Sequence, residues 1–284
     1  MKPMESHLVE FADDDELRQG DIIFKAGING QESQWGFILN ADCDIAQGKT
    51  KRSYTIVDIM SSEIYLEKVW APAQLNKLID RYSELPLEKI SSVMRASSIT
   101  ERITPEILKG WILDVGPERF ECQVNKTGST FDQKTKSYLK ALYTALKNDN
   151  SRNNMERLRL ARQCIDASSQ NFRRQIADAF GGEHGFPDFF FLPEVPRGSA
   201  FGSVVILRSI RALTASDLVL TETDARIAGR QEVFHRVGRL ADGLRFAISQ
   251  KLTFLFSRIG MPKKFEDSCK AAIELLAEQE GGDW

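Results

Sequence analysis

Alternating apolar and polar residues predict a β-rich region at the start of the chain. Three runs are typical of strands: GDIIFKAG at residues 20–27, WGFILNA at 35–41 and SYTIVDI at 53–59. The third run has the two-residue period of a half-buried strand, and a glycine ends the first. These runs predict a small antiparallel barrel or meander within residues 1–60.

Residues 61–182 change to the three-to-four-residue spacing of amphipathic helices. An interruption at Pro72 falls within the first of these helices. Thr104 followed by Pro105 is a helix start signal, and Asp132 is the expected cap of another amphipathic run. The pattern therefore predicts a helical middle segment.

Residues 183–284 return to β-type runs before two final helices. The apolar runs at 189–192 and 204–207 are separated by prolines and glycines, and helical patterns follow at 242–260 and 263–279. The order of runs repeats that of the first β region, which is consistent with a duplication. Whether the two β regions form separate units or pack together stays open.

Length and composition favour two lobes. A chain of 284 residues with 42% apolar content can bury one large core or two modest ones. The formal net charge of −2 provides no overall positive field to attract nucleic acid or an anionic membrane. The first residues lack the apolar region of a signal peptide, and no run of eighteen apolar residues occurs, so we expect a cytoplasmic protein without membrane contact.

The cysteines and histidines do not form a metal-binding motif. The chain has four cysteines without a C-x-x-C pair and three widely separated histidines. Glycine-rich nucleotide-binding loops, the G-x-S-x-G nucleophile motif and H-E-x-x-H are also missing from the sequence. We therefore expect neither a metal nor a cofactor.

The sequence ADCDI places a cysteine between two aspartates after the second predicted strand. A nucleophilic cysteine needs a nearby cation, histidine or helix N-terminus, whereas adjacent carboxylates disfavour the thiolate. We therefore expect Cys43 to be a small buried residue at the strand end, and Asp44 to accept backbone N–H groups in a turn or helix cap. Two alternatives remain: a catalytic or metal role for Asp42, Cys43 or Asp44, and contact with a ligand or partner.

A second candidate site is a basic segment near the C-terminus. Its candidate binding residues are Arg230, His235, Arg236, Arg239 and Arg258. If these side chains share one face, they form a phosphate-binding patch, because the planar guanidinium group suits phosphate. The alternatives are a solvated face with salt bridges to neighbouring carboxylates, and a protein interface.

Two similarities to known families start from the same strands. Residues 20–40 resemble the opening of the SH3-like barrel of the MazF/PemK toxin superfamily. The stretch ending in CDI, with DFFFLP and RVGRLADGLRFAISQKLTFLFSRIGMP, is also similar to uncharacterised bacterial proteins whose equivalent strand ends in a CDI or CDL turn. The toxins have an arginine just before the second strand, where this chain has Gln34 and Trp35.

The predicted fold is α+β, with one or two small SH3-like β-barrels, a helical middle segment and closing C-terminal helices. The expected parts are residues 1–60, 61–182 and 183–284. The predicted function is a non-catalytic binding or assembly component with a protein partner. The resemblance implies a bacterial multi-protein system of the host-defence or toxin–antitoxin kind. The alternatives are a MazF/PemK-like endoribonuclease with a rearranged site, and a nucleic-acid-binding module that uses the arginine segment.

Overall fold

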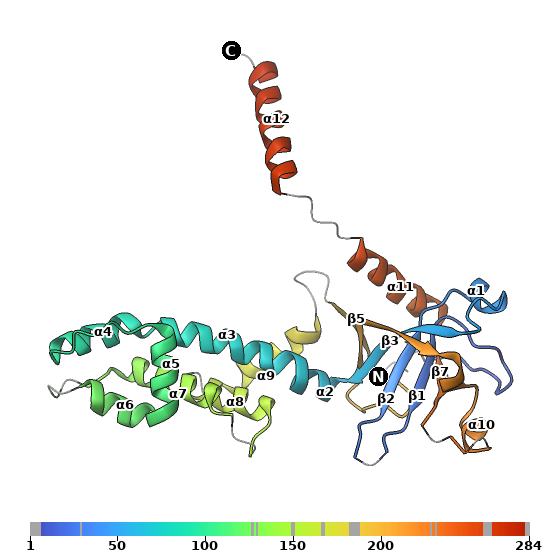
Figure 1. Cartoon of the computed structure of the whole chain (residues 1–284), viewed down its shortest axis with the longest axis horizontal. Helices are drawn as coiled ribbons and strands as arrows, with labels where there is room; N and C mark the ends of the chain where they lie inside the picture. The colour runs from blue at the N-terminus through green and yellow to red at the C-terminus, as the bar shows by residue number, and fades with distance from the viewer. Residues whose placement is uncertain are drawn as a thin grey trace.

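The protein combines one β-sheet with an elongated group of helices (Figure 1). The computed structural model describes residues 7–28, 30–125, 128, 130–148, 151–165, 168–181, 188–227, 229–230, 232–257 and 263–281. Helices and strands both contribute substantially, so the α+β prediction is confirmed.

The sheet has seven strands in the order β4-β5-β3-β2-β1-β7-β6. The strands are β1 (Asp21–Lys25), β2 (Gln34–Ile38), β3 (Ser53–Ser61), β4 (Phe189–Leu192), β5 (Ser203–Thr214), β6 (Leu218–Val219) and β7 (Phe234–Arg239). All neighbours pair antiparallel except β6 and β7, which are parallel. The first three strands form the predicted antiparallel meander.

The two predicted β regions share this one sheet. β3 pairs with β5, which places Val57 opposite Ile210 and Ile59 opposite Val205. Within the described residues β4 and β6 are the two edges, so the sheet does not close, and one or two SH3-like barrels are not confirmed. The sequence pattern identifies strands but not their partners, and β5 of the second region occupies the free edge of β3.

Helix α11 (Asp242–Phe256) covers one face of the sheet. Ile248, Leu252 and Leu255 of this helix pack in a core with Val57 and Val205. Successive strand residues point to opposite faces, so a second core lies on the other side. Its buried members are Leu17, Ile23, Ile38, Ile56, Leu213, Leu218 and Phe234. Three short helices lie in the connections: α1 (Asp42–Ala46), η2 (Ala215–Asp217) and α10 (Glu222–Ile227).

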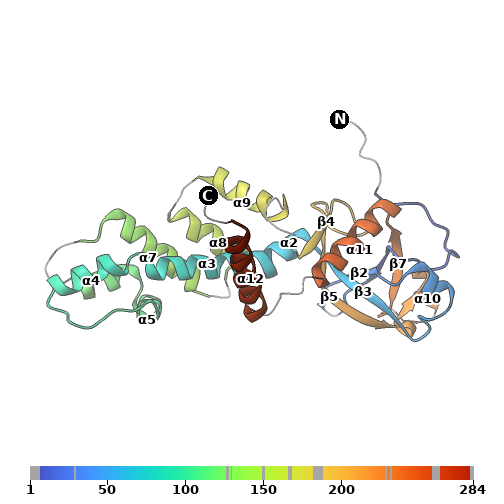
Figure 2. The ribbon, with the colours of Figure 1, turned by 90° about the horizontal axis from the view of Figure 1, so that it is seen from above.

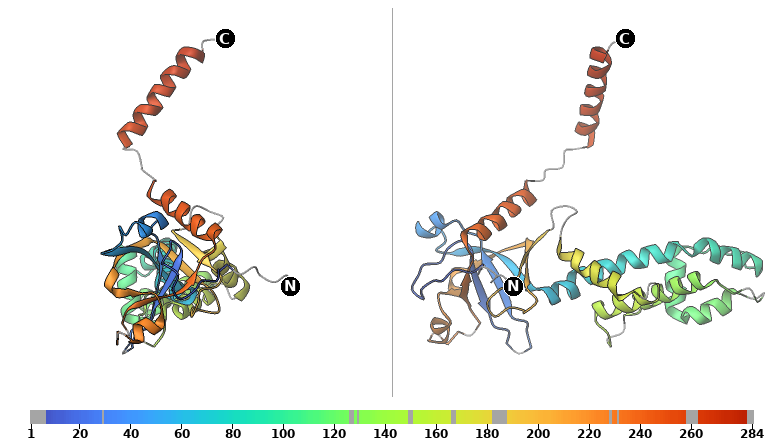
Figure 3. Two further views of the ribbon diagram at one scale, coloured as in Figure 1. Left: turned by 90° about the vertical axis from the view of Figure 1, so that its right-hand side faces the viewer. Right: turned by 180° about the vertical axis from the view of Figure 1, so that it is seen from behind.

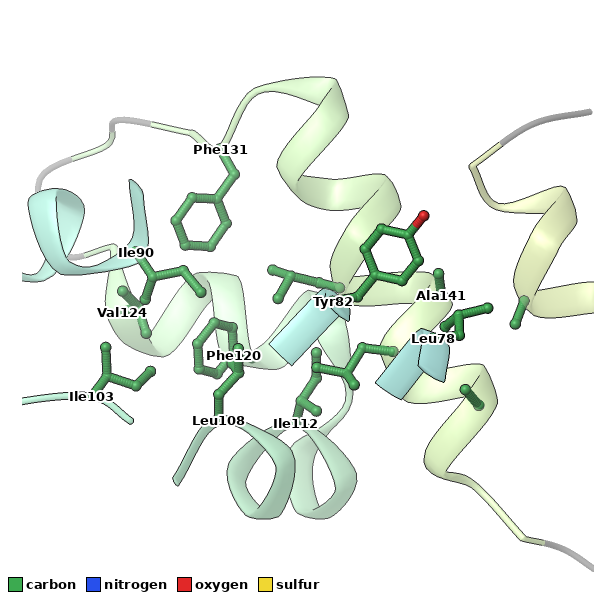
Figure 4. Close-up of a cluster of buried hydrophobic side chains, with 14 of the residues drawn as sticks. Leu78, Tyr82, Ile90, Ile103, Leu108, Ile112, Phe120, Val124, Phe131 and Ala141 are labelled. Carbon is green, nitrogen blue, oxygen red and sulfur yellow. The ribbon is translucent and has the colours of Figure 1, made fainter. Parts of the chain in front are cut away.

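The helical lobe lies between β3 and β4 in the chain. Its elements are α2 (Ser62–Tyr65), η1 (Leu66–Trp70), α3 (Ala71–Glu84), α4 (Leu87–Ala96), α5 (Pro105–Val115), α6 (Pro117–Val124), α7 (Gln133–Leu146), α8 (Asn154–Gln163) and α9 (Ser169–Gly181). Apolar side chains from several of these helices form a core of their own (Figure 4). Leu108, Ile112 and Phe120 are fully buried there.

The helix start signals in the sequence are confirmed. Thr104 accepts a hydrogen bond from the backbone N–H of Ile107, and Asp132 accepts one of 2.7 Å from that of Thr135. The interruption expected at Pro72 is a widened π-helical turn, η1, and the helix continues through it. A proline ring clashes with the carbonyl four residues earlier, and the wider turn just before Pro72 accommodates it.

Aromatic packing joins the helical lobe to the sheet where α2, α9 and β4 lie close together; Figure 2 shows the position of these three elements. The ring centroid of Tyr65 in α2 lies 5.1 Å from that of Phe189 in β4 and 5.7 Å from that of Phe180 in α9. The two chain segments that connect the lobes therefore meet beside the edge strand of the sheet. The predicted domain boundaries at residues 60 and 182 stay a prediction.

The last helix, α12 (Lys263–Gly281), extends away from both lobes (Figures 1 and 3). None of its described side chains belongs to the four apolar cores. None of the described helices combines the length and the apolar composition needed to cross a membrane.

Candidate functional site

The Asp42-Cys43-Asp44 sequence forms the exposed helix α1. The expectation of a buried Cys43 is wrong: strand β2 ends at Ile38, and the helix that follows buries none of its residues. The Sγ of Cys43 lies 4.0 Å from a carboxylate oxygen of Asp44, which is an anion and not the cation that an activated thiol needs. The catalytic role weighed for these three residues stays a prediction.

Asp42, and not Asp44, accepts the backbone N–H group. Its Oδ1 accepts a hydrogen bond of 2.8 Å from the N–H of Gln19, and its Oδ2 accepts one of 2.6 Å from Nη1 of Arg245. Burial opposes ionisation of Asp42, but these bonds outweigh it and hold the pKa of its carboxyl below the ordinary value. Asp44 bonds the ammonium group of Lys49 instead.

The approach of Arg245 requires a glycine on the opposing loop. Gly20 has a φ of +93°, and a Cβ added there would lie 2.8 Å from the Cβ of Arg245. Only glycine adopts this conformation readily while leaving room for the arginine side chain. Asp42 and Arg245 therefore hold α1, the N-terminal loop and α11 together.

The residues of the predicted arginine patch differ in their exposure, and their binding role stays a prediction. Arg230 is exposed and bonds Asp217, whereas Arg236 and Arg239 are buried; Arg258 lies outside the described residues. Arg236 donates hydrogen bonds to four backbone carbonyls of residues 12–16, and its guanidinium lies 4.4 Å from the ring centroid of Phe11. To bind phosphate, the two buried arginines would have to leave their internal partners.

Arg239 is paired with a fully buried carboxylate. Its Nε lies 2.7 Å from Oδ1 of Asp21, and Asp21 has an exposed fraction of 0%. A buried charge is costly unless it is paired and hydrogen-bonded, so each residue depends on the other. The predicted alternative is a solvated face with salt bridges to carboxylates nearby in the sequence; Arg239 is buried instead, and its partner Asp21 is distant in the sequence.

His235 is buried in β7 and lies at the wall of a polar cavity. Its ring packs edge-on to Phe24, with 5.7 Å between the centroids. Burial, and next the charge of Arg197, lower the pKa of His235, while Glu222 acts in the opposite direction. The imidazole is therefore neutral at neutral pH. Arg197 and Glu222 are far from His235 in the sequence, and no local pattern predicts that they meet it.

The two C-terminal helices expose apolar side chains that the sequence interpretation did not separate from the core. In α11, Phe246 is 54% exposed and Phe256 is 58% exposed, while Ile248 is fully buried. In α12, Ile273 is 65% exposed. The sequence does contain a signal for this exposure, because α11 carries apolar residues at more positions than one buried helix face can hold.

The described residues do not bring three histidine, cysteine or carboxylate side chains together in a group able to hold a metal ion. No family model matches the chain, and neither does a curated protein or a solved structure.

Proposed function

We propose that the protein is a non-catalytic binding or assembly component that holds a protein partner through its C-terminal helices. The observation that carries this proposal is the position of α12, a helix of 19 residues that extends away from both lobes. Its sequence is amphipathic, and Ile273 is 65% exposed. Most of the stability of a helix in a protein comes from packing of its amphipathic face, so an apolar partner surface would stabilise α12.

The outer surface of α11 supports the same proposal. Phe246 and Phe256 are both more than half exposed, although their helix is anchored to the sheet by Ile248. Aromatic side chains are enriched at the centres of protein interfaces, where they contribute much of the binding energy. A partner that contacts both helices would bury these rings together with Ile273.

The proposed setting is a bacterial multi-protein system of the host-defence or toxin–antitoxin kind. Its support is the sequence similarity of residues 20–45, 188–193 and 236–262 to bacterial proteins with a CDI or CDL turn. The alternatives are a MazF/PemK-like endoribonuclease and a nucleic-acid-binding module. The internal partners of Arg236 and Arg239 favour the assembly proposal over nucleic-acid binding through those residues.

The test compares two variants that add the same charge to opposite faces of α12. Ile273→Glu places a carboxylate on the apolar face, whereas Ala271→Glu places it on the polar face, where Ala271 is exposed. The tagged full-length protein and both variants are purified from the native cells, and co-purified proteins are quantified by mass spectrometry. We expect a stoichiometric partner with the natural protein and with Ala271→Glu, and its loss with Ile273→Glu.

Two results would contradict the assembly proposal. One is the same recovery of a partner with both variants, because the apolar face of α12 would then be irrelevant to binding. The other is co-purified nucleic acid without a protein partner, or cleavage of RNA by the purified chain, either of which would favour an alternative function.

A further inference from the structure

A polar cavity of about 260 Å³ lies beside β7, away from α12. It is bounded by the N-terminal loop, the loop between β4 and β5, the start of α10, and β7. The side chains important here are Phe11, Arg197, Glu222, Thr223, His235 and Arg236. The cavity is distinct from the surface proposed above for a protein partner.

His235 gives this cavity a buried side chain without a partner. The residue is only 6% exposed, and its Nε2 makes no hydrogen bond to any described residue. Folded proteins pair nearly all of their buried polar atoms, so an unpaired one needs an explanation. A neutral imidazole carries one N–H donor, and a ligand in the cavity would give the ring a partner.

Arg197 is held at the cavity wall in an unusual backbone conformation. Its φ is 59°, in the left-handed region that residues other than glycine rarely adopt and that is often found at functional sites. The guanidinium lies 5.3 Å from the ring centroid of Phe24, and Nη2 bonds the carboxylate of Glu222. The Nε and Nη1 atoms bond no described residue, so the cation retains free donors.

The charges around the cavity favour an anion. Arg197 and Arg236 line the cavity together with the carboxylates of Glu222 and Asp13, and Arg226 bonds Glu222 from outside the lining. Arg197 and Arg226 both bond Glu222 and lower its pKa to about 2, so its charge is already compensated. Arg236 directs its hydrogen bonds to neutral backbone carbonyls, and its Nη1 lies 3.8 Å from the buried carboxylate of Asp21, which it shares with Arg239.

We propose that this cavity binds the phosphoryl group of a small phosphorylated molecule. The free donors of Arg197, the hydroxyl of Thr223 and the N–H of His235 would contact the phosphoryl oxygens. Thr223 forms no side-chain hydrogen bond to the described part of the chain, so its hydroxyl is free to donate. Arginine and hydroxyl donors of this kind are common in phosphate sites.

The experiment follows the three histidines of the full-length protein by nuclear magnetic resonance during titration with inorganic phosphate. The histidine signal that is missing from the spectrum of His235→Gln is assigned to His235. We expect saturable shifts of the His235 signal and a raised pKa of its imidazole when phosphate binds, because a dianion favours the protonated ring. A parallel titration with adenosine monophosphate distinguishes a nucleotide ligand, which binds more tightly than phosphate, from recognition of phosphate alone.

Two variants and a control connect the shifts to the cavity. Arg197→Gly removes the guanidinium while fitting the positive φ, so the fold is retained, and Thr223→Val removes an exposed hydroxyl. We expect each to weaken phosphate binding at least tenfold. Arg208→Gln, which removes an exposed arginine paired with Asp188, leaves binding unchanged. Unshifted His235 signals at millimolar phosphate, or equal weakening in the Arg208 control, would overturn the proposal.

Discussion

Arg239 of β7 and Asp21 of β1 form a buried ion pair with two hydrogen bonds, of 2.7 Å and 3.1 Å. The same guanidinium donates to the backbone carbonyl of Glu16 at 2.8 Å, so the pair also fixes the N-terminal loop over the sheet. The hydrogen bond to Asp21 raises the pKa of Arg239 above its ordinary value, so the guanidinium remains charged in the folded state.

Replacement of Arg239 by alanine would remove both side-chain hydrogen bonds of the buried Asp21 carboxylate to this arginine, leaving it the backbone N–H of Arg18 and the guanidinium of Arg236 at 3.8 Å. We expect the free energy of unfolding, measured in urea, to fall by about 3–5 kcal/mol. The matched control is Arg230→Ala, which removes an exposed arginine from its pair with Asp217 and leaves the unfolding midpoint nearly unchanged. Similar losses in the two variants would contradict the structural role of the buried pair.

The bond between Asp42 and Arg245 predicts a specific dependence of stability on pH. The pKa of Asp42 is lowered from 3.8 in the folded state, so its bonds stabilise the fold fully above that value. This contribution is lost as the pH falls from 3.8 through the lower folded-state pKa. In urea unfolding over this acidic range, the natural protein should lose stability more steeply than Asp42→Asn.

Asp44→Asn provides the control for the pH experiment, because Asp44 is on the same short helix but its carboxylate bonds Lys49 and the neighbouring thiol rather than Arg245. We expect this variant to keep the steep acidic slope of the natural protein. Suppose that the steep acidic fall in the free energy of unfolding disappears in Asp44→Asn and persists in Asp42→Asn. The pair of Asp42 with Arg245 would then not be the cause of the pH dependence.

The two faces of α11 should respond differently to truncation. Ile248 is fully buried against the sheet, so Ile248→Ala should lower the free energy of unfolding by about 2–5 kcal/mol. Phe246 is 54% exposed, and Phe246→Ala should cost less than about 1 kcal/mol. Thermal and urea unfolding test both values, and a larger loss for Phe246→Ala would mean that its ring belongs to the folded core.

Local signals predicted much of the secondary structure. The caps at Thr104 and Asp132 depend on residues three positions apart, and the strand runs of the first region have a recognisable period. The pairing of β3 with β5 joins residues such as Val57 and Ile210, which are separated by the whole helical lobe. A single sequence contains no periodic signal for such a contact, and separate barrels were therefore a reasonable but unconfirmed expectation.

The candidate sites show the same limit. His235 was identified from its basic surroundings, yet its cavity neighbours Arg197 and Glu222 come from other segments of the chain. The neighbouring aspartates, which disfavour a thiolate, predict that Cys43 is a small buried residue at the strand end, but the strand ends at Ile38 and the chain then turns onto the surface. Burial beyond the end of a strand depends on tertiary packing, which the period of the strand does not report.

Glu67 in the π-helical turn η1 should control the start of α8. Its two carboxylate oxygens accept the backbone N–H groups of Asn154 at 2.7 Å and Met155 at 2.9 Å. Glu67→Ala would leave these donors without the acceptor that satisfies a helix start, so we expect faster amide hydrogen exchange at both positions. Glu63→Ala is the control, because exposed Glu63 bonds the Ser199 hydroxyl and not α8. Unchanged exchange in Glu67→Ala would mean that Asn153, the cap residue of α8, is sufficient to hold the helix start.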